Sequence, residues 1–502
     1  MSRRAGVWAL TAGAAMVYCL QALLDYRRFL TSTFDLVIFD QGIRGYAHFH
    51  APVSIARGVA DGYGVHFSLL SDHWSPILAL LAPLYWIHGS PATLLVAQAV
   101  LFALAIPPLW VYADRKLGSP AAYLVCAGYA LSLPVMAAVV FDFHEVAFVP
   151  VLTAFMVERF TLPPDAGGRW QAALAAAVLL LVKEDMGLLL AGFGLYLLAS
   201  RRWRLGACLA AGGLLATWLA SRVLISAFGG DPGFYWAYGQ FGSSPASALL
   251  NVLGHPLHAI REFFAPWVKT RTMIGLVATF AFTPLASPLV LAALPLLAER
   301  MLASGYPLWW QAKFQYDAFL IMVVACAAVD GAARIDRWLG GRVLRLKRYT
   351  WRFSLLWAAA VCAAALVYVP SSPFGDLLRP STYSASAREQ AAAAAIGHVP
   401  AGALVEAADS IGPRLSGRDT VLLLDGTPRW APWVVADTTG RNFPFCAPAQ
   451  QAAEVAFYLA NGYTQVFASH GYVVLYRPAD GRTAQALAHP KAADRLHLNV
   501  CY

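Results

Sequence analysis

The sequence predicts a mainly helical, polytopic membrane bundle with a small α/β domain at its C-terminal end. Of the 502 residues, 59% are hydrophobic and only 13% are charged, and the mean hydropathy is +0.55. Soluble globular chains carry about 25% charged residues, so we expect the lipid bilayer as a partner. The net charge of +9 comes from basic residues in short loops between apolar segments. That pattern is typical of membrane topology and not of a nucleic-acid-binding face, so no nucleic acid is expected.

Eleven apolar segments are candidate membrane spans. A span needs roughly 20 apolar residues, and 170–182 and 186–200 are shorter, so we expect them inside the bundle, where neighbours satisfy their ends. The first segment is expected to be an uncleaved span, because no A-x-A-like site follows it. The eleven segments are 6–24, 91–112, 119–141, 145–162, 170–182, 186–200, 205–228, 272–287, 288–305, 316–333 and 354–370.

The distribution of basic residues predicts a cytoplasmic N-terminus and an extracytoplasmic C-terminus. With eleven spans, the predicted inner loops hold 16 basic and five acidic residues, whereas the predicted outer loops before residue 370 hold ten basic and thirteen acidic ones. The apolar segment 75–89 is short and contains two prolines, and counting it as a span would place the arginine clusters outside. We therefore expect it to lie at the outer interface or to re-enter. The inner basic residues are Arg3, Arg4, Arg115, Lys116, Arg159, Arg169, Arg201, Arg202, Arg204, Arg334, Arg337, Arg342, Arg345, Lys347, Arg348 and Arg352.

The composition divides the chain into a transmembrane domain, 1–370, with a long first outer loop at 25–90, and a more polar extracytoplasmic domain, 371–502. Short β-like runs in the second part alternate with helical stretches, which predicts a small α/β domain. Its two cysteines, Cys446 and Cys501, could form a disulfide outside the cytoplasm. The β-like runs are "ALVEAA", "TVLLL", "WVVAD", "TQVFA" and "YVVLYRP".

Ionisable side chains gather in five separate outer segments. Charged groups next to hydrocarbon are costly, so they are candidates for function. For each motif alone, a purely structural role remains an alternative: a solvated helix end, an ion pair within a loop, or a hydrogen bond that closes a turn. The candidates are Asp35 and Asp40 in "FDLVIFDQ", Asp72 and His73 in "SDHW", Asp142, His144 and Glu145 in "FDFHE", Lys183, Glu184 and Asp185 in "VKED", and Arg300, Lys313 and Tyr316 around the last outer loop.

Two kinds of ligand would suit these side chains. Asp35, Asp40 and His144 are among several possible ligands of a divalent metal, although no spacing has the specificity of a zinc motif, so no cofactor is certain. Lys183, Arg300 and Lys313 could hold a phosphate or pyrophosphate headgroup. The alternative for each of the three is an ordinary ion pair or a contact with lipid headgroups.

Four of these stretches, in this order and spacing, resemble a family of bacterial multispanning membrane proteins known as domain of unknown function 2079. They are "FDLVIFDQ", "HWSPILALLAPLYWI", "FDFHEVAFVPVL" and "LLLVKEDMGLLL". That family is similar to the GT-C superfamily of integral-membrane glycosyltransferases, which take a sugar from a polyprenyl-phosphate lipid and usually invert the anomeric centre. The resemblance implies a bacterial plasma-membrane enzyme with a polyprenyl-phosphate sugar and an acceptor of unknown identity as partners.

The resemblance also implies roles for the residues. Asp40, or else Asp35, would be the general base that deprotonates the acceptor hydroxyl, with His73, Asp142, His144, Glu145, Arg300, Lys313 and Tyr316 near the substrate. Glu184 and Asp185 would support the site or, with Asp35 and Asp40, bind a metal such as Mg²⁺ or Mn²⁺, and Lys183 would neutralise the leaving phosphate. The two aspartates are separated by four residues and do not form the compact D-x-D pair of many GT-C enzymes, which argues against metal chelation by that pair.

Two other functions are compatible with a bundle of this kind. A transporter or flippase for lipid-linked or charged solutes would also carry ionisable residues, but usually near the bilayer midplane and with inverted repeats. A non-catalytic membrane anchor for 371–502 gives no reason for the acidic motifs of the first loop. The clustering of charges at one face favours an enzyme.

Overall fold

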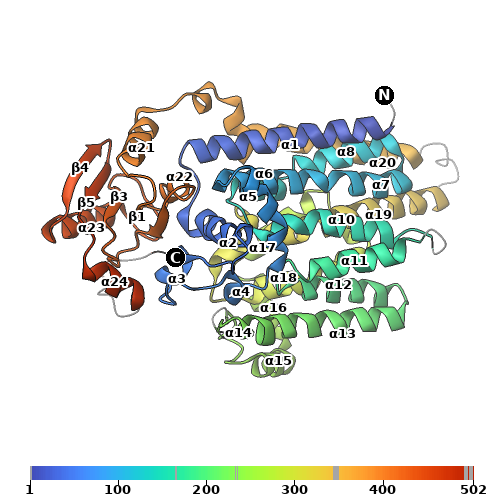
Figure 1. Cartoon of the computed structure of the whole chain (residues 1–502). Helices are drawn as coiled ribbons and strands as arrows, with labels where there is room; N and C mark the ends of the chain where they lie inside the picture. Colours follow the sequence, from blue (N-terminus) through green and yellow to red (C-terminus); the bar gives the residue numbers. More distant parts are fainter. Residues whose placement is uncertain are drawn as a thin grey trace.

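The protein consists of a bundle of helices and a C-terminal domain built on a small sheet (Figure 1). This computed structural model describes residues 3–163, 167–231, 233, 236–342, 350–490, 496 and 501. The sheet domain lies beyond one end of the bundle. Two short helices of the first loop, α2 (Ile38–Ala47) and α3 (Ile55–Ala60), lie between the two parts (Figure 1).

Five helical segments of the described residues are long and apolar enough to cross a membrane. A pair bent by 42° at a short break, α8 and α9, would make a sixth if it is one span. Each of these segments coincides with a predicted span. The five are α1 (Arg3–Arg27); α6 (Pro91–Leu104) with α7 (Ile106–Leu117); α13 (Trp203–Leu219) with η5 (Ala220–Leu224) and α14 (Ile225–Ala227); η9 (Gln315–Asp317) with α19 (Ala318–Arg342); and α20 (Thr350–Tyr368) with η11 (Val369–Ser371).

The other predicted spans are shorter helices, so the number of eleven is not confirmed. The interior position expected for 186–200 agrees with α12, most of whose side chains are buried. Among the predicted inner basic residues, Arg345, Lys347 and Arg348 lie outside the described residues. The shorter elements are α8 (Ser119–Ala130), α9 (Leu133–Val140), η3 (Glu145–Ala147), α10 (Phe148–Phe160), α11 (Gly168–Leu179), α12 (Met186–Ala199), α15 (Pro245–Gly254), α16 (Pro256–Phe264), α17 (Trp267–Ala278), η6 (Thr283–Ala286), η7 (Pro288–Ala293), α18 (Leu294–Leu302) and η8 (Pro307–Trp310).

Small residues allow α12 and α13 to pack backbone against backbone. A Cβ atom added at Gly187 would lie 2.2 Å from the carbonyl oxygen of Gly213, and one added at Gly194 would lie 2.5 Å from the amide nitrogen of Ala210. Close approach through small residues is how helices associate where lipid removes the hydrophobic driving force. The bundle therefore uses a packing mode suited to a bilayer.

The first loop is a series of short helices and turns. The predicted helix at 75–89 is present but divided at residue 81, where Pro83 at the second position of α5 suits a new helix start. It packs against α2 and is apolar but too short to cross a membrane. The elements not yet named are η1 (Thr33–Val37), α4 (Leu69–Asp72), η2 (Pro76–Leu81) and α5 (Ala82–Ile87).

The C-terminal domain is a five-stranded mixed sheet in the order β2-β1-β3-β5-β4. The first three strands are parallel, and β5 and β4 add to them as an antiparallel pair. All five predicted β-like runs form strands, because buried β-branched and apolar residues fill the three central ones. The elements are η12 (Pro373–Leu378), η13 (Pro380–Tyr383), α21 (Ala387–Gly397), β1 (Leu404–Ala407), α22 (Gly412–Leu415), β2 (Thr420–Leu423), β3 (Trp433–Asp437), α23 (Pro448–Ala460), β4 (Thr464–Ser469), β5 (Tyr472–Tyr476) and α24 (Gly481–Ala488).

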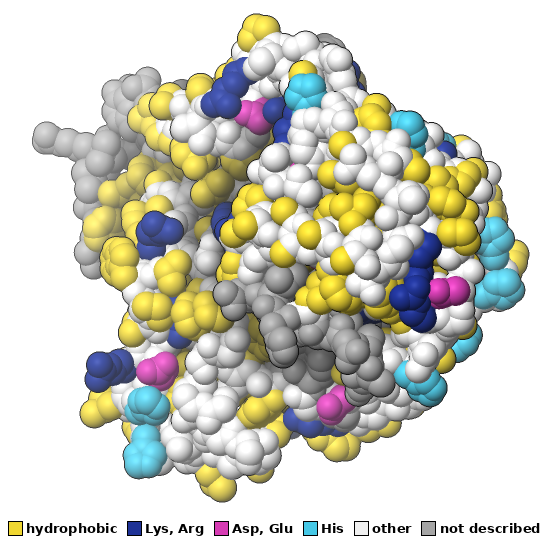
Figure 2. All heavy atoms as spheres, turned by 90° about the vertical axis from the view of Figure 1, so that its left-hand side faces the viewer, with side chains coloured by type: hydrophobic (Ala, Val, Ile, Leu, Met, Phe, Trp, Pro, Cys, Tyr) yellow, Lys and Arg dark blue, Asp and Glu magenta, His cyan; other side chains and the backbone are white. Residues whose placement is uncertain are grey.

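A disulfide joins Cys446 and Cys501, whose Cα atoms are 5.1 Å apart, so the pairing that the sequence left open is present. The face of the molecule at this end is shown in Figure 2. In its described part, basic side chains are scattered and several lie beside acidic ones, so they form no single basic patch.

The C-terminal domain shares a hydrophobic core with the first loop. Phe29, Val37 and Ala56 of the loop are buried in the same cluster as β1 and α21 of the domain. Polar contacts support this packing: the side-chain amide of Gln41 donates to the carbonyl oxygen of Val421 at 3.0 Å. The domain and the first loop therefore form one packed unit.

Candidate active site

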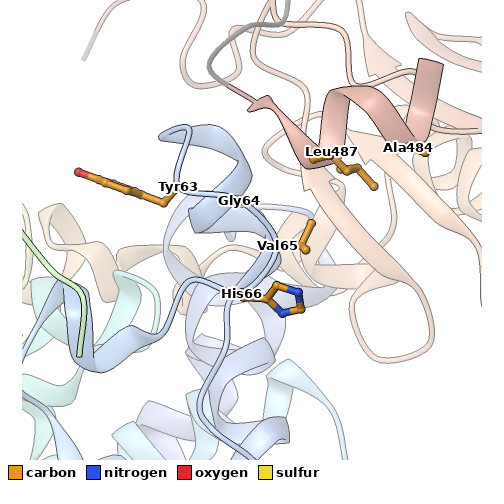
Figure 3. Close-up of a pocket in the computed structure, with 7 residues that line it drawn as sticks. Tyr63, Gly64, Val65, His66, Ala484 and Leu487 are labelled. Carbon is orange, nitrogen blue, oxygen red and sulfur yellow. The ribbon is translucent and has the colours of Figure 1, made fainter. Parts of the chain in front are cut away.

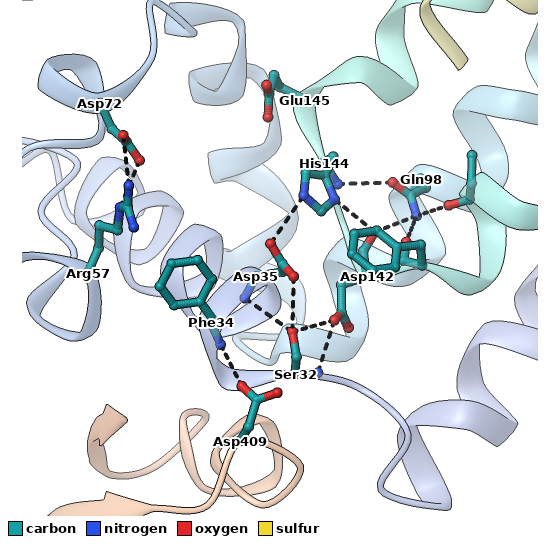
Figure 4. Close-up of polar contacts among 12 residues, drawn as sticks. Ser32, Phe34, Asp35, Arg57, Asp72, Gln98, Asp142, His144, Glu145 and Asp409 are labelled. Atoms are coloured by element: carbon teal, nitrogen blue, oxygen red, sulfur yellow. Dashed lines mark hydrogen bonds and ion pairs between the residues drawn. The ribbon is translucent and has the colours of Figure 1, made fainter. Parts of the chain in front are cut away.

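Asp35 lies in η1, at the junction of the bundle and the C-terminal domain (Figure 4). The Ser32 hydroxyl caps this short helix and accepts a hydrogen bond from the Asp35 amide at 3.2 Å. One carboxylate oxygen of Asp35 is 3.4 Å from Nε2 of His144, and the other is 3.4 Å from the Ser32 hydroxyl oxygen. The side chain is 29% exposed, so it can meet a substrate.

Asp142 fixes the backbone that carries Asp35. It is buried, and its Oδ2 accepts from the Ser32 amide at 3.0 Å and from the Ser32 hydroxyl at 2.6 Å. Its Oδ1 has no hydrogen-bond partner among the described residues. Burial, and then the Asp35 carboxylate, raise the pKa of Asp142 well above its ordinary value. Asp142 therefore anchors the backbone of the first loop at Ser32.

A buried glutamine holds the turn that contains Asp142 and His144. Gln98, on α6, donates from its amide nitrogen to the carbonyl oxygens of Ala138, Phe141 and Asp142 at 2.9–3.0 Å. Its carbonyl oxygen accepts from the His144 amide at 3.0 Å. The sequence analysis missed Gln98. A lone polar residue in the apolar stretch "LLVAQAVLF" is the signal that could have found it.

The C-terminal domain contributes Asp409, which the sequence analysis also missed. Its carboxylate accepts from the Phe34 amide at 3.0 Å, and its carbonyl oxygen accepts from both the amide and the hydroxyl of Thr33 at 2.7 Å (Figure 4). Burial and the Asp35 charge raise the pKa of Asp409 to about 7, against the lowering effect of the Phe34 hydrogen bond. Asp409 follows β1 closely, and side chains at the carboxyl ends of parallel strands commonly form sites.

The structure argues against Asp40 as the general base. Asp40 is completely buried and accepts hydrogen bonds from the Tyr85 hydroxyl at 2.8 Å, the Ser416 hydroxyl at 2.5 Å and the Arg44 guanidinium at 3.1 Å. Burial raises its pKa, and these three partners oppose that shift. Because every side of the carboxylate is occupied by the protein, the catalytic expectation passes to Asp35.

A second group of predicted residues forms ion pairs beside the first. Nζ of Lys183 is 2.7 Å from Glu145, and Nδ1 of His73 is 2.7 Å from Glu184, which also accepts from the Trp74 amide at 3.0 Å. Burial raises the pKa of Glu184, but His73 and Lys183 outweigh it and lower the pKa to about 2. We call Ser32, Asp35, Asp142 and His144 the Asp35 cluster. The second group lies next to this cluster because His144 and Glu145 are adjacent in the sequence.

Asp185 ends the "VKED" turn without an ion pair among the described residues. Burial, and then the adjacent Glu184 charge, raise its pKa to about 6, against the lowering effects of the Lys183 and His73 charges and of a hydrogen bond with Glu299. Two carboxyl groups in such contact share a proton readily. Asp185 is therefore a structural partner of Glu299 more than a ligand facing the Asp35 cluster.

The three residues predicted around the last loop have different environments. Arg300 is buried, donates to the Gln311 carbonyl oxygen at 3.0 Å and forms an ion pair with Asp317. The guanidinium carbon of Arg300 lies 5.7 Å from the ring centroid of Tyr316.

Lys313 is the exposed cation of this loop. Its Nζ lies 4.7 Å from the ring centroid of Phe314. Phe314 contacts Phe141 edge to face at 5.1 Å, and Phe141 stacks on His144 at 5.3 Å. Within the described residues Lys313 forms no ion pair, unlike Lys183 and Arg300. A chain of aromatic rings thus joins Lys313 to the histidine that faces Asp35.

The four predicted metal ligands do not fit a single ion. Asp40 is enclosed by Tyr85, Ser416 and Arg44, Glu184 pairs with His73, and Asp35 lies in a separate cluster. In the part of the chain that the structure describes, no three histidine, cysteine or acidic side chains are arranged to hold a metal. No step of a mechanism is therefore assigned to a cation bound by this set.

A separate hollow of about 490 Å³ lies where residues 63–66 of the first loop face α24 (Figure 3). Tyr63, Val65, His66 and Leu487 line it. None of the predicted site residues does, so it is distinct from the Asp35 cluster.

A solved GT-C glycosyltransferase has a fold similar to that of this chain. ArnT from Cupriavidus metallidurans, in its crystal structure bound to undecaprenyl phosphate, matches with a TM-score of 0.53 and 13% sequence identity over 95% of this chain and 98% of that chain. The Archaeoglobus fulgidus oligosaccharyltransferase, tethered with an acceptor peptide, gives a TM-score of 0.45 and 12% identity over 94% of this chain and 74% of that one. No curated protein sequence matches the chain.

The family is shown by the sequence itself. The model of the family described as predicted membrane protein DUF2079 matches residues 25–474, which include the first loop, the "FDFHE" and "VKED" turns and most of the C-terminal domain. The chain therefore belongs to the DUF2079 family of predicted membrane proteins.

Proposed function

We propose that the protein is an integral-membrane glycosyltransferase that moves a sugar from a polyprenyl-phosphate donor to an acceptor hydroxyl, with Asp35 as the general base. The observation that carries this proposal is the partly exposed Asp35 carboxylate, held by Ser32 and facing His144. The GT-C type fold supports it, because the similar ArnT structure holds undecaprenyl phosphate.

The proposed step is a displacement at the anomeric carbon. The acceptor oxygen attacks this carbon from the face opposite the phosphate, and its proton passes to the Asp35 carboxylate. The bond between the anomeric carbon and the phosphate oxygen breaks, and the polyprenyl phosphate leaves with the electron pair. One displacement inverts the anomeric centre.

The leaving phosphate needs a cation that is not already neutralised. Lys183 and Arg300, two of the predicted ligands, are ion-paired with Glu145 and Asp317. Lys313 is exposed and next to the aromatic rings that lead to His144. We therefore favour Lys313 as the residue that stabilises the leaving group.

The site is proposed to face away from the cytoplasm. Basic residues favour the predicted inner loops, and the Cys446–Cys501 disulfide suits an oxidising compartment. The acceptor would then be a component of the cell envelope.

The proposal is tested with an Asp35→Asn variant in cells that express it at the normal level. An enzyme loses its product and accumulates the polyprenyl-phosphate sugar on the outer leaflet, as measured by mass spectrometry of lipid extracts and by surface accessibility of the lipid-linked sugar. Removing a general base costs about 10²- to 10⁴-fold in rate. Asp61→Asn is the matched control, because Asp61 lies in the same loop but pairs with Arg57.

Two outcomes would contradict the proposal. Accumulation of the donor on the inner leaflet would indicate a flippase. Unchanged lipid pools in Asp35→Asn, together with a defect on deletion of 371–502, would indicate a non-catalytic anchor.

A further inference from the structure

The backbone that carries Asp35 is held from two sides by buried carboxyl groups of different parts of the chain. Asp142, from the helical bundle, accepts two hydrogen bonds from Ser32. Asp409, from the C-terminal domain, accepts from the Phe34 amide, while its carbonyl oxygen binds Thr33 twice. Figure 4 shows both side chains converging on the Ser32–Asp35 segment.

The three carboxyl groups differ in access to solvent. Asp142 and Asp409 are 5% and 9% exposed, whereas the Asp35 side chain is 29% exposed. Only Asp35 can therefore meet a substrate, and the other two can act only through it. The Asp35 charge affects the ionisation of both neighbours.

The contacts of Asp409 span 375 positions of sequence and cannot form unless the C-terminal domain is docked. Docking is reinforced around the same segment, since Tyr26 donates to the Pro413 carbonyl oxygen at 3.1 Å and Phe34 packs on Phe443 with ring centroids 4.9 Å apart. The geometry of η1 thus depends on the domain.

We propose that Asp409 is a positioning residue of the site, so that the C-terminal domain is a working part of the transferase and not an appended module. Asp409 fixes the Thr33–Asp35 backbone in the orientation that presents the Asp35 carboxylate to His144. This inference rests on the proposed function, in which Asp35 is the base.

Removing the Asp409 carboxylate has two consequences. In Asp409→Asn the Phe34 amide is bound by a neutral amide oxygen in place of the carboxylate, which is a weaker acceptor, so the Asp35 side chain is less well directed, and a misplacement of about 1 Å can cost about 100-fold in rate. Where Asp409 is ionised, the change also removes one negative charge from beside Asp35. The charged and titratable groups around this cluster are Asp35, Asp142, His144, Glu145, Lys183, Tyr316 and Arg57, whose guanidinium lies over the Phe34 ring.

The test compares Asp409→Asn with Asp419→Asn in the full-length chain. Asp419 is an equally buried aspartate of the same domain that accepts from the Ala403 amide at 3.2 Å and pairs with Arg418, away from η1. Isolated membranes are assayed for consumption of their own polyprenyl-phosphate sugar between pH 5 and 9. Asp409→Asn is expected to lower the rate 10- to 100-fold, while Asp419→Asn leaves the rate unchanged.

A second readout does not depend on catalysis. In an Asp35→Cys background, the rate of alkylation by N-ethylmaleimide is measured against pH, with the chain that keeps Asp35 as the background control. We expect Asp409→Asn, but not Asp419→Asn, to shift the midpoint of this labelling to lower pH. Unchanged labelling and an unchanged rate would overturn the inference.

The two proposals fail in different ways. If Asp35→Asn keeps full turnover, the proposed function is wrong whatever Asp409 does. If Asp35→Asn is inactive but Asp409→Asn matches Asp419→Asn in both readouts, only the role of Asp409 is wrong.

Discussion

At the scale of residues, two aspartates of one short motif have opposite environments. Asp35 is partly exposed and has weak contacts at 3.4 Å. Asp40 is fully buried and has strong contacts with Tyr85, Ser416 and Arg44. A general base must accept a proton from the substrate and later release it. A buried carboxylate that is hydrogen-bonded to the protein on all sides instead stabilises the fold. Mutation of the two should therefore affect different properties.

Asp40→Asn is expected to reduce stability more than chemistry. The change weakens bonds to three partners and leaves Arg44 without its carboxylate, which should lower the free energy of unfolding by about 1 to 3 kcal/mol. The measurement is thermal unfolding of the detergent-solubilised protein, beside turnover of the lipid-linked sugar per folded molecule. Asp35→Asn is the comparison and should show the reverse, with unchanged unfolding and lost turnover. A stable but inactive Asp40→Asn protein would indicate that Asp40, and not Asp35, is the general base.

The contribution of Asp409 to the stability of the protein should fall as pH rises through the range in which this residue ionises. Its folded pKa is about 7, above the value of about 3.9 for an unfolded aspartate. Between these two values the folded state binds more protons than the unfolded state. The stabilising contribution of Asp409 is therefore fully present below about pH 4 and is lost as pH rises to about 7. Glu406, also near pKa 7, contributes with the same sign.

The contribution of Asp409 is isolated by difference. Unfolding of the wild type and of Asp409→Asn is followed from pH 4 to 8, and the variant should lose about 1 to 4 kcal/mol less stability over this range. Parallel curves for the two proteins would show that Asp409 does not titrate in this interval.

At the scale of elements, the turn between α9 and η3 depends on one side chain. Gln98 satisfies two carbonyl oxygens and one amide of this turn and one carbonyl oxygen at the end of α9, and the turn carries both Asp142 and His144. Buried backbone groups that lose such partners are costly. The turn is therefore the most sensitive of the polar elements near Asp35.

Gln98→Leu should destabilise the protein by about 2 to 4 kcal/mol, because four hydrogen bonds vanish while the volume is nearly kept. Turnover should also fall, since His144 loses its backbone anchor. Gln390→Leu is the control: Gln390 is exposed and donates a single bond to the Ala385 carbonyl oxygen at 3.1 Å, so a change within about 0.5 kcal/mol is expected. Equal effects of both variants in thermal unfolding would contradict the role assigned to Gln98.

The sequence could predict elements better than contacts. Apolar segments and β-like runs predicted the long apolar helices and all five strands, because hydropathy and residue shape act locally. The number of spans stayed unresolved because helices such as α11 and α12 are short and sit against others in the bundle. Periodicity alone cannot tell a short span from a buried helix.

The candidate site was predicted only in part, because the sequence shows local polarity but not contacts between distant residues. Asp35, Asp142 and His144 were found because their motifs are polar among apolar neighbours. The burial of Asp40 and the position of Asp409 could not be foreseen for one reason: both depend on contacts between residues about 375 positions apart, Asp40 with Ser416 and Phe34 with Asp409. Local sequence carries no information about such docking.

At the scale of the whole molecule, the disulfide offers a direct test of orientation. Cys446 and Cys501 are bonded, and the five other cysteines are free. Disulfides persist outside the cytoplasm and are reduced within it. If the C-terminal domain is extracytoplasmic, protein taken from acid-quenched cells and denatured should gain five maleimide-polyethylene glycol groups without reductant and seven with it.

The Cys446→Ser variant sharpens the assay, because its freed Cys501 should raise the unreduced count from five to six. The same variant should lower the stability of the C-terminal domain by about 2 to 4 kcal/mol, since the bond closes a loop of 55 residues. Because that domain holds Thr33 and Phe34, weakening it should also slow turnover without any change in the bundle. Seven labelled thiols in the unreduced wild type would place the domain in the cytoplasm, and with it Asp35, on the side where an extracytoplasmic acceptor cannot reach.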